Sequence, residues 1–325
     1  MKLKKLLSLV IAVVCLAAVC VPFTSCNNDE DQKYTIGICQ LIQHSALDAA
    51  TKGFKDALIA EFGEENVEFI EQNAQGDSNT CSTIVNDLVN KRVDLILANA
   101  TAPLQAAANA TATIPILGTS VTDYGTALNI SNWNGIAGGN ISGTTDLAPL
   151  DKQADMILEL YPDAKTVGVI YCAAEPNSEY QYKVIKDYLA TKGVTANKHT
   201  FNDGNDAAAV SAAAAAANDV LYIPTDNTAA ACTETILGAI GNAPLIAGES
   251  GICSGCGVAT LSIDYYDLGF TTGKMAAKIL KGEADISTMK VESVSEFTKM
   301  YNKSRCESLG IDTAALEAKG YTAIK

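Results

Sequence analysis

The sequence repeats a strand-and-helix pattern, with TIGI at residues 35–38 followed by KDAL at 55–58, and TVGV at 166–169 followed by KDYL at 186–189. The two copies lie 131 residues apart, since 166 minus 35 and 186 minus 55 are both 131. In each copy an apolar strand leads through a polar loop into an amphipathic helix, which is half of a βαβ unit. The pattern therefore predicts two similar α/β lobes.

A second pair of segments extends this similarity along the chain. VDLIL at residues 93–97 and IPIL at 114–117 are matched by NDVLY at 218–222 and APLI at 243–246. This period is too long for a solenoid, whose repeats span about 20 to 50 residues, so it indicates duplication of a whole domain. Alternating strands and helices favour mainly parallel sheets covered on both faces. We expect two doubly wound, Rossmann-like α/β lobes joined by a hinge.

The amino terminus has the features of an export signal. Lys2, Lys4 and Lys5 precede an apolar run over residues 6–21, interrupted only by a serine. FTSC at residues 23–26 resembles a bacterial lipobox, in which Cys26 would be lipidated and become the first mature residue. We expect a lipoprotein signal peptide at 1–25, an anchor linker at 26–33 and a lipid-anchored protein on the extracytoplasmic face of the cell membrane. An uncleaved anchor and an ordinary secretory signal are the alternatives.

Net charge and hydropathy restrict the class of partner. The formal net charge is −14, and removing residues 1–25 takes away three lysines and no acids, which gives −17. Such an acidic surface disfavours nucleic-acid binding, which depends on lysine and arginine at phosphates. After Cys26, no apolar run approaches the roughly 20 residues that a spanning helix needs, so we expect this part of the chain to be soluble.

Cysteines and catalytic motifs give no sign of chemistry. Seven cysteines follow Cys26, and an odd number favours small buried side chains over a disulfide framework. CSGC at residues 253–256 has neither a second pair nor a nearby histidine to complete a zinc site, so we expect no metal. GESG at residues 248–251 is one residue short of G-x-S-x-G, and phosphate-binding glycine loops are absent from the sequence, so we expect neither enzyme activity nor a cofactor.

Polar or small residues gather where each predicted strand ends. The six clusters lie at residues 40–44, 99–101, 118–123, 172–178, 224–227 and 248–250. Parallel sheets place ligands at the carboxyl ends of their strands, so we expect these clusters to line a cleft between the lobes, three from each side. Ser45, Asn177 and Thr228 could equally be ordinary helix caps, each worth about 1 kcal/mol to its helix. For His44 we expect a hydrogen-bonding or structural role.

Several motifs together resemble one protein family. They are GICQ at residues 37–40, HSALDAA at 44–50, QNAQGD at 72–77, VDLILA at 93–98, PTDNT at 224–228 and IDYYDLG at 263–269. These motifs are similar to those of the tryptophan/tyrosine-type ABC transporter substrate-binding proteins. The resemblance covers nearly the whole mature chain.

The resemblance implies a type I periplasmic-binding-protein fold with three crossovers between its lobes. Lobe 1 would comprise residues 34–145 and 264–288, and lobe 2 residues 146–263 and 289–325. A monomer of this kind would deliver a small ligand to an ABC permease in the membrane. The sequence departs from the family at Ser45, where proline is common, and at residues 248–250, where serine and aspartate are usual, so the fold is better determined than the ligand.

The strand ends and the resemblance together indicate a set of candidate ligand-binding residues. They are Gln43, His44, Ser45, Ala100, Thr101, Thr119, Asp123, Asn177, Ser178, Thr225, Asp226, Asn227, Glu249, Ser250 and Tyr265. We expect an amino acid, and an aromatic one in particular, as the ligand. Its carboxylate would lie at helix N-termini near Ser45 and Ser178 with Thr101, and its ammonium at Asp226 and Asp123.

Two other functions use the same cleft. The protein could be the ligand-sensing component of a signalling system, which would bind the same class of ligand without transport. It could also be an enzyme of α/β fold, for which Asp123, Glu175, Asp226 and Glu249 are acid candidates without an evident partner. A neighbouring gene for a permease or for a receptor kinase would distinguish transport from sensing.

Overall fold

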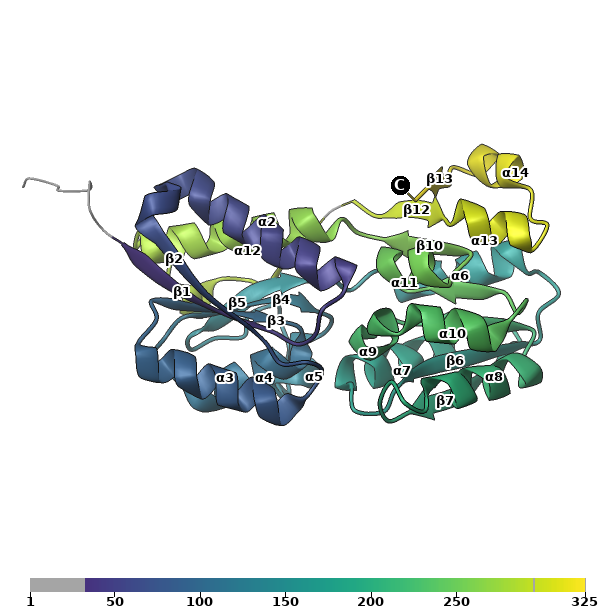
Figure 1. Ribbon diagram of the computed structural model, residues 1–325, viewed down its shortest axis with the longest axis horizontal. Coiled ribbons are helices and arrows are strands. Elements are labelled where there is room, and N and C mark those ends of the chain that lie inside the picture. Colours follow the sequence, from purple (N-terminus) through teal and green to yellow (C-terminus); the bar gives the residue numbers. More distant parts are fainter. Residues whose placement is uncertain (1–32, 295, 325) are drawn as a thin grey trace, which may run out of the picture. The chain divides into compact units, whose positions relative to one another are not determined.

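The computed structural model describes residues 33–294 and 296–324, which form two α/β sheets (Figure 1). One sheet has six strands in the order β11-β5-β4-β3-β1-β2, and the other has seven in the order β13-β12-β10-β9-β8-β6-β7. The expected signal peptide and Cys26 lie outside the described residues. Within the described part of the chain, no helix is both long and apolar enough to cross a membrane.

All strand pairs of the first sheet are parallel. Its strands are β1 (Tyr34–Gln40), β2 (Val67–Asn73), β3 (Leu95–Asn99), β4 (Ile116–Val121), β5 (Ile141–Thr145) and β11 (Glu292–Ser293). Its helices are α2 (Ser45–Phe62), α3 (Ser78–Lys91), α4 (Thr101–Ala110), α5 (Tyr124–Ala127) and α12 (Tyr265–Leu280), with short 3-10 turns at Glu64–Asn66 and Ile286–Thr288. Apolar side chains pack α2 and α12 against one face and α3 and α4 against the other (Figure 1).

The second sheet is parallel except between β10 and β12. Its strands are β6 (Thr166–Cys172), β7 (Thr195–Phe201), β8 (Val220–Ile223), β9 (Leu245–Ala247), β10 (Ala259–Ser262), β12 (Thr298–Tyr301) and β13 (Thr322–Ala323). Its helices are α6 (Leu150–Leu160), α7 (Pro176–Thr191), α8 (Ala207–Ala217), α9 (Asn227–Ala231), α10 (Thr233–Ile240), α11 (Ser250–Gly255), α13 (Lys303–Ser308) and α14 (Thr313–Ala318). Two apolar clusters, one on each face, form its core.

The expected class of fold, two α/β lobes with mainly parallel sheets, is confirmed. The repeated segments become β1 and β6, each followed by a long helix, and the alanine-rich run lies within α8. After β8 the chain forms two short helices, α9 and α10, which are separated at Cys232. Residues 141–145, the end of the first segment expected for lobe 1, form β5 of the first sheet.

The chain passes between the two sheets after β5, after β10 and after β11. The expected lobe boundaries remain a prediction, and the strands differ from them at one place. The resemblance assigns residues 289–325 to the second lobe, whereas β11 pairs with β5 of the first sheet. The last crossover therefore follows residue 293.

Helices α2 and α12 approach each other closely because glycines lie at their contact. A Cβ atom on Gly269 of α12 would lie 1.9 Å from the backbone oxygen of Ala50 in α2. A Cβ atom on Gly53 of α2 would lie 2.1 Å from the backbone oxygen of Tyr266 in α12. The two backbones are therefore nearly in contact, which fixes how the helices that begin at residues 45 and 265 are placed.

The seven cysteines of the described residues are all free, and six of them are buried. Cys232 is half-buried. Cys253 lies on α11 and Cys256 directly follows that helix, and both are free, buried thiols. Within the described residues, no group of three or more histidine, cysteine or acidic side chains could hold a metal ion.

Candidate ligand-binding site

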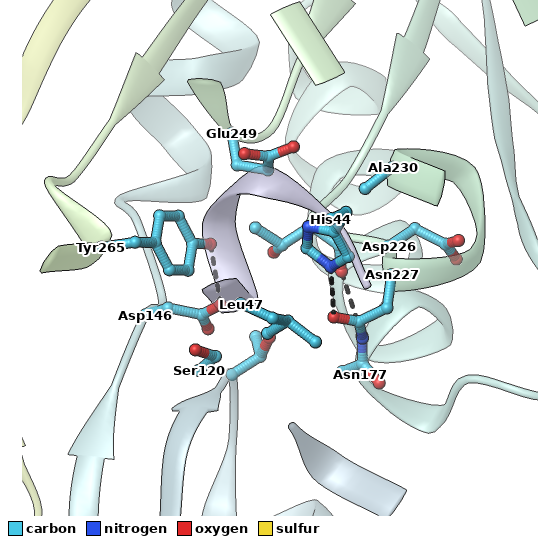
Figure 2. Close-up of a pocket in the computed structure, with 12 residues that line it drawn as sticks. His44, Leu47, Ser120, Asp146, Asn177, Asp226, Asn227, Ala230, Glu249 and Tyr265 are labelled. Carbon is cyan, nitrogen blue, oxygen red and sulfur yellow. Dashed lines mark hydrogen bonds between the residues drawn. The ribbon is translucent and has the colours of Figure 1, made fainter. Parts of the chain in front are cut away.

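A pocket lies where strand ends of the two sheets meet (Figure 2). It is lined by His44, Leu47, Ser120, Thr122, Asp146, Asn177, Thr225, Asp226, Asn227, Ala230, Glu249 and Tyr265. The free space between these residues is about 270 Å³ including its opening, but the centre of a water molecule can reach only about 10 Å³ of it. That is room for about one water. A ligand of amino-acid size therefore requires side chains or lobes to move apart.

The predicted site residues fall into three groups. Seven of them line this pocket, namely His44, Asn177, Thr225, Asp226, Asn227, Glu249 and Tyr265. Ser45 and Ser250 instead line an adjoining groove, which also includes Tyr265, and Gln43 lines a separate groove beside α2. The pocket lining does not include Ala100, Thr101, Thr119, Asp123 or Ser178. Ser120 and Thr122 belong to the predicted cluster at residues 118–123 but are not among the candidate ligand-binding residues. Leu47, Asp146 and Ala230 lie outside the predicted clusters.

The pocket concentrates buried polar atoms that have no hydrogen-bond partner. Ten such side-chain atoms occur among the described residues, and four of them belong to pocket residues: His44 Nδ1, Ser120 Oγ, Asp146 Oδ1 and Asn177 Oδ1. Buried polar atoms are nearly always paired in folded proteins. This group therefore indicates a ligand with complementary polar atoms.

The tautomer of His44 follows from its neighbours. Its Nε2 lies 3.3 Å from Oδ1 of Asn227, and Nδ2 of the same amide donates to Oε2 of Glu175 at 2.8 Å. Since a carboxylate only accepts, the amide orientation is fixed and Nε2 of His44 must donate. Burial lowers the pKa of His44, which favours the neutral ring. Its Nδ1 is then a hydrogen-bond acceptor that lies in the pocket.

Two other unpartnered atoms are also acceptors. Asn177 donates through Nδ2 to the backbone oxygen of Thr225 at 3.0 Å, which leaves Oδ1 as the atom without a partner. Asp146 accepts through Oδ2 from the hydroxyl of Tyr265 at 2.9 Å, and its Oδ1 is unpartnered. The twelve described residues that line the pocket include no lysine or arginine. The unpartnered acceptors of the pocket therefore suit a ligand group with several N–H donors. A primary ammonium group has three such donors.

The N-terminus of α2 provides a different chemical environment at the same pocket. His44 is its N-cap but makes no side-chain capping hydrogen bond, whereas Asp226 caps α9 and Glu249 caps α11. His44 and Leu47, at either end of the first turn of α2, both line the pocket. Uncapped N–H groups and the positive end of an 18-residue helix suit an anionic group such as a carboxylate.

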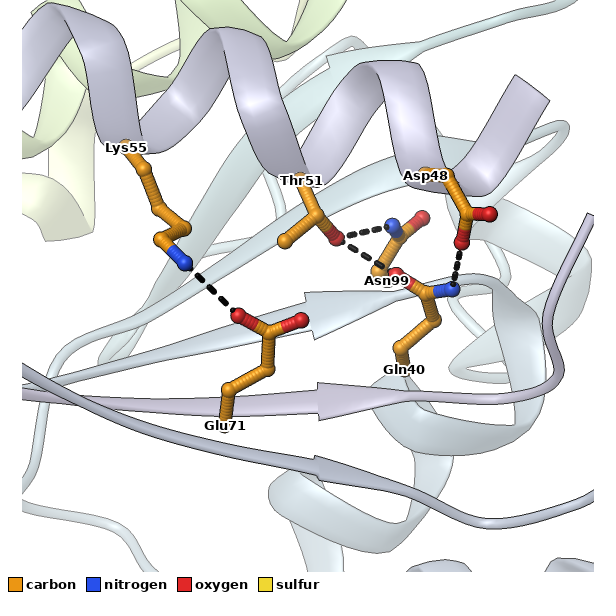
Figure 3. Close-up of polar contacts among 6 residues, drawn as sticks. All are labelled: Gln40, Asp48, Thr51, Lys55, Glu71 and Asn99. Atoms are coloured by element: carbon orange, nitrogen blue, oxygen red, sulfur yellow. Dashed lines mark hydrogen bonds and ion pairs between the residues drawn. The ribbon is translucent and has the colours of Figure 1, made fainter. Parts of the chain in front are cut away.

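A polar network, buried except for Asp48, holds this helix end on the first sheet (Figure 3). Asn99, at the end of β3, donates through Nδ2 to the backbone oxygen of Leu47 and to Oγ1 of Thr51, both at 2.9 Å. Thr51 donates to Oε1 of Gln40 at 2.6 Å, and Gln40 donates through Nε2 to Asp48 at 2.7 Å. The ends of β1 and β3 therefore fix the position of the first two turns of α2.

The two acids predicted to receive an ammonium already have other partners. Asp226 accepts at Oδ2 from Cys172 N at 2.8 Å and Ser178 Oγ at 2.7 Å, and at Oδ1 from Ala229 N at 2.8 Å. Asp123 caps α5. Asp146 differs from both acids because its Oδ1 has no hydrogen-bond partner and could still accept from an ammonium group. It was missed because it follows β5, a strand that the sequence pattern does not predict.

Burial shapes the ionisation of the acids in the pocket. It raises the pKa of Asp146. Burial, followed by the charge of Glu175, raises the pKa of Asp226 to about 8. Burial raises the pKa of Glu249 to about 7, although backbone N–H groups of α11 oppose the shift. These carboxyl groups lie together without a cationic side chain, so their ionised forms are costly in the absence of a positive ligand.

We expect the stability of the unliganded protein to fall between about pH 6.5 and pH 8. In this range the folded state retains a proton on Asp226, and up to about pH 7 also on Glu249, that the unfolded state has already released, so rising pH favours unfolding. His44 acts in the opposite direction only at lower pH, where its unfolded form becomes protonated. Thermal unfolding midpoints across this range test the prediction. Glu249→Gln should flatten the slope, and a midpoint that rises with pH would contradict it.

Comparison with known families identifies the class of protein. A family described as ABC transporter substrate binding protein matches residues 35–317. The chain belongs to this family. It is therefore a substrate-binding protein of an ABC transporter, and its family is not one of enzymes.

Relatives of this substrate-binding protein agree with its fold. A curated protein of Clostridioides difficile named tyrosine-binding protein is 33% identical, and the match covers 100% of this chain and 97% of that relative. A crystal structure of an ABC domain from Streptococcus pneumonia in complex with L-Trp is 29% identical, with a TM-score of 0.84 over 90% of this chain and 100% of that one.

A third relative differs in conformation. The ligand-free, open structure of a substrate-binding protein with adhesive properties from Clostridium difficile is 34% identical and covers 90% of this chain and 99% of its own, but its TM-score is 0.68. Agreement is thus better with the L-Trp complex than with the open structure, although the sequence identity is lower. This substrate-binding protein therefore resembles the ligand-bound form more closely.

Proposed function

We propose that this substrate-binding protein captures a free α-amino acid outside the cytoplasm for an ABC importer. One observation carries the proposal: the same pocket contains the acceptors Asp146 Oδ1, His44 Nδ1 and Asn177 Oδ1 and the uncapped N-terminus of α2. The acceptors match the three N–H donors of an α-ammonium group. The helix end suits an α-carboxylate. A zwitterion is complementary to both.

An aromatic side chain is the best candidate for the rest of the ligand. The names of two relatives mention tyrosine and L-Trp, which are both aromatic amino acids. In the adjoining groove the centre of a water molecule can reach about 260 Å³. This groove shares Tyr265 with the pocket and includes the apolar residues Ala46, Ala49, Ile263 and Met300. Burying an aromatic side chain of 150–250 Å² contributes roughly 4 to 6 kcal/mol, about half or more of the −8 kcal/mol of a micromolar complex.

Closure of the two lobes would follow from contacts that a ligand makes on both sides. His44 lies between β1 and α2 in the first lobe, and Asp146 directly follows β5 of the same lobe. Asn177 lies on α7 in the second lobe. Only a ligand that binds the closed state more tightly shifts the population toward it. Because the closed pocket has room for about one water, entry requires an open state.

Calorimetry with the twenty amino acids tests the proposed ligand class. We expect heat with tyrosine or tryptophan, and binding at least about a hundredfold weaker when the same ring carries only the amine or only the carboxylate. Tyramine and 3-(4-hydroxyphenyl)propionate are the matched analogues of tyrosine. If no amino acid binds, or if an analogue lacking the amine binds as well as the amino acid, the zwitterion proposal is wrong.

Membrane attachment and transport belong to the same proposal. We infer that Cys26 is lipidated and that a monomer delivers its ligand to an ABC permease, as the lipobox-like sequence and the family suggest. Mass spectrometry of the mature N-terminus, compared with Cys26→Ser, tests lipidation. Ligand uptake by vesicles that contain the permease tests transport, and binding to a receptor kinase without uptake would instead support a sensing role.

A further inference from the structure

We propose that Tyr265 is a positioning residue that couples recognition of the ligand's ammonium group to closure of the lobes, through its hydrogen bond to Asp146. The inference rests on the proposed function, because it requires an ammonium group at Asp146. Membership of the family does not imply such a contact, which directly links two of the segments that join the sheets. We call this hydrogen bond the crossover clasp.

The two residues of the clasp lie on different crossovers. Asp146 directly follows β5, where the chain first leaves the first sheet, and Tyr265 begins α12, where the chain has just returned from β10. The hydroxyl of Tyr265 donates to Oδ2 of Asp146 at 2.9 Å, and each residue is only 6% exposed (Figure 2). A bond between two crossovers is sensitive to hinge motion because both partners lie where the lobes are joined.

Neighbouring bonds hold both partners in place. Thr145, beside Asp146, donates through Oγ1 to the backbone oxygen of Thr122 at 2.8 Å, which ties the first crossover to the end of β4. Asp264, beside Tyr265, caps α12 by accepting from the backbone N–H of Tyr266 at 2.8 Å. The clasp therefore joins two anchored segments, and its geometry depends on how these segments are oriented.

The other oxygen of Asp146 connects the clasp to the pocket. Oδ1 has no partner, and Asp146 and Tyr265 both line the pocket. An ammonium at Oδ1 would favour the ionised carboxylate, and a hydrogen bond to an ionised acceptor is stronger than one to a neutral acceptor. Burial raises the pKa of Tyr265 well above its usual value, so the phenol remains a donor. Ligand binding thus strengthens the bond between the crossovers, and this gain exists only in the closed state.

The variant Tyr265→Phe tests the clasp. Calorimetry with tyrosine and with 3-(4-hydroxyphenyl)propionate would show whether the hydroxyl matters for the ammonium in particular. We expect tyrosine to bind about tenfold more weakly, as for loss of one charge-assisted hydrogen bond, and the analogue to change less than about twofold. Small-angle scattering should also show a smaller ligand-induced decrease in the radius of gyration.

Tyr266→Phe is the matched control. Tyr266 is the next residue of α12, and its hydroxyl donates to Asp56 at 2.9 Å, outside the pocket. This control should leave unchanged the affinity for tyrosine, the affinity for its analogue and the ligand-induced decrease in the radius of gyration. If Tyr265→Phe weakens the binding of tyrosine and of its analogue equally, the hydroxyl has a merely structural role and the clasp proposal is wrong. If the variant weakens the binding of neither ligand, the proposal is also wrong. If the wild-type protein binds no amino acid, it is the proposed function that fails.

Discussion

Asp146→Asn is expected to weaken binding of the amino acid by at least about a hundredfold, because the change removes the negative charge that faces the ligand's ammonium. The amide can still accept from Tyr265 through its oxygen, but it then directs an NH₂ group to the position of the unpartnered Oδ1. That group has no lone pair for an ammonium. Calorimetry with tyrosine and tryptophan measures the effect.

Folding and binding should respond differently to this change. Burial raises the pKa of Asp146, so a neutral amide of the same size removes the cost of an ionised acid in the unliganded protein. We therefore expect an unchanged or higher thermal midpoint without ligand. The matched control is Asp123→Asn, since Asp123 caps α5 and does not line the pocket. It should lower stability slightly and leave affinity unchanged, and equal losses of affinity in both variants would refute the assignment.

The parts of the fold that could be predicted from the sequence are those in which each strand is a continuous apolar run. Residues 93–97 are of this kind apart from Asp94, and they include the first part of β3, whose residues are all buried. In contrast, β5 reads ISGTT, and its Gly143 has a φ of 144° and lies against the backbone of Gly118. A strand of small and polar residues has no apolar signal, because its stability depends on neighbours that are distant in the sequence.

The same difference explains what was found and missed in the site. Strand-end reasoning located Asn177, Asp226 and Glu249, because each follows a recognisable strand of the second lobe. It could not locate Asp146, since β5 was not recognised. It also could not show that Asp226 is occupied, because two of its three donors, Cys172 and Ser178, lie about 50 residues away in the chain. Hydrogen-bond partners of this kind are decided by tertiary structure.

The buried acids of the pocket should also make ligand binding depend on pH. The raised pKa values of Asp226 and Glu249 mean that the empty pocket retains protons near neutral pH. A cationic group close to these acids favours their ionised forms, so binding is expected to release protons and to become tighter as pH rises. The same acids that destabilise the empty protein at higher pH therefore favour a ligand that carries an ammonium.

Gly269→Ala is expected to destabilise the first lobe by about 3 kcal/mol, a large effect for the addition of one methyl group. The added Cβ would lie 1.9 Å from the backbone oxygen of Ala50, and a backbone atom cannot rotate away as a side chain can. Helices α2 and α12 must therefore separate. Urea unfolding followed by fluorescence measures the effect, because the single tryptophan, Trp133, packs against the core of the first lobe.

The control for this prediction is Gly238→Ala in α10. A Cβ atom at that position meets nothing within 4 Å, so the helix should gain up to about 1 kcal/mol from the better propensity of alanine. Similar unfolding curves for the two variants would show that the α2–α12 contact is not tightly packed. The consequence for function follows from geometry: α2 begins beside His44 and α12 begins at Tyr265. Any Gly269→Ala protein that still folds should therefore also bind its ligand more weakly, because separating the helices displaces two sides of the pocket.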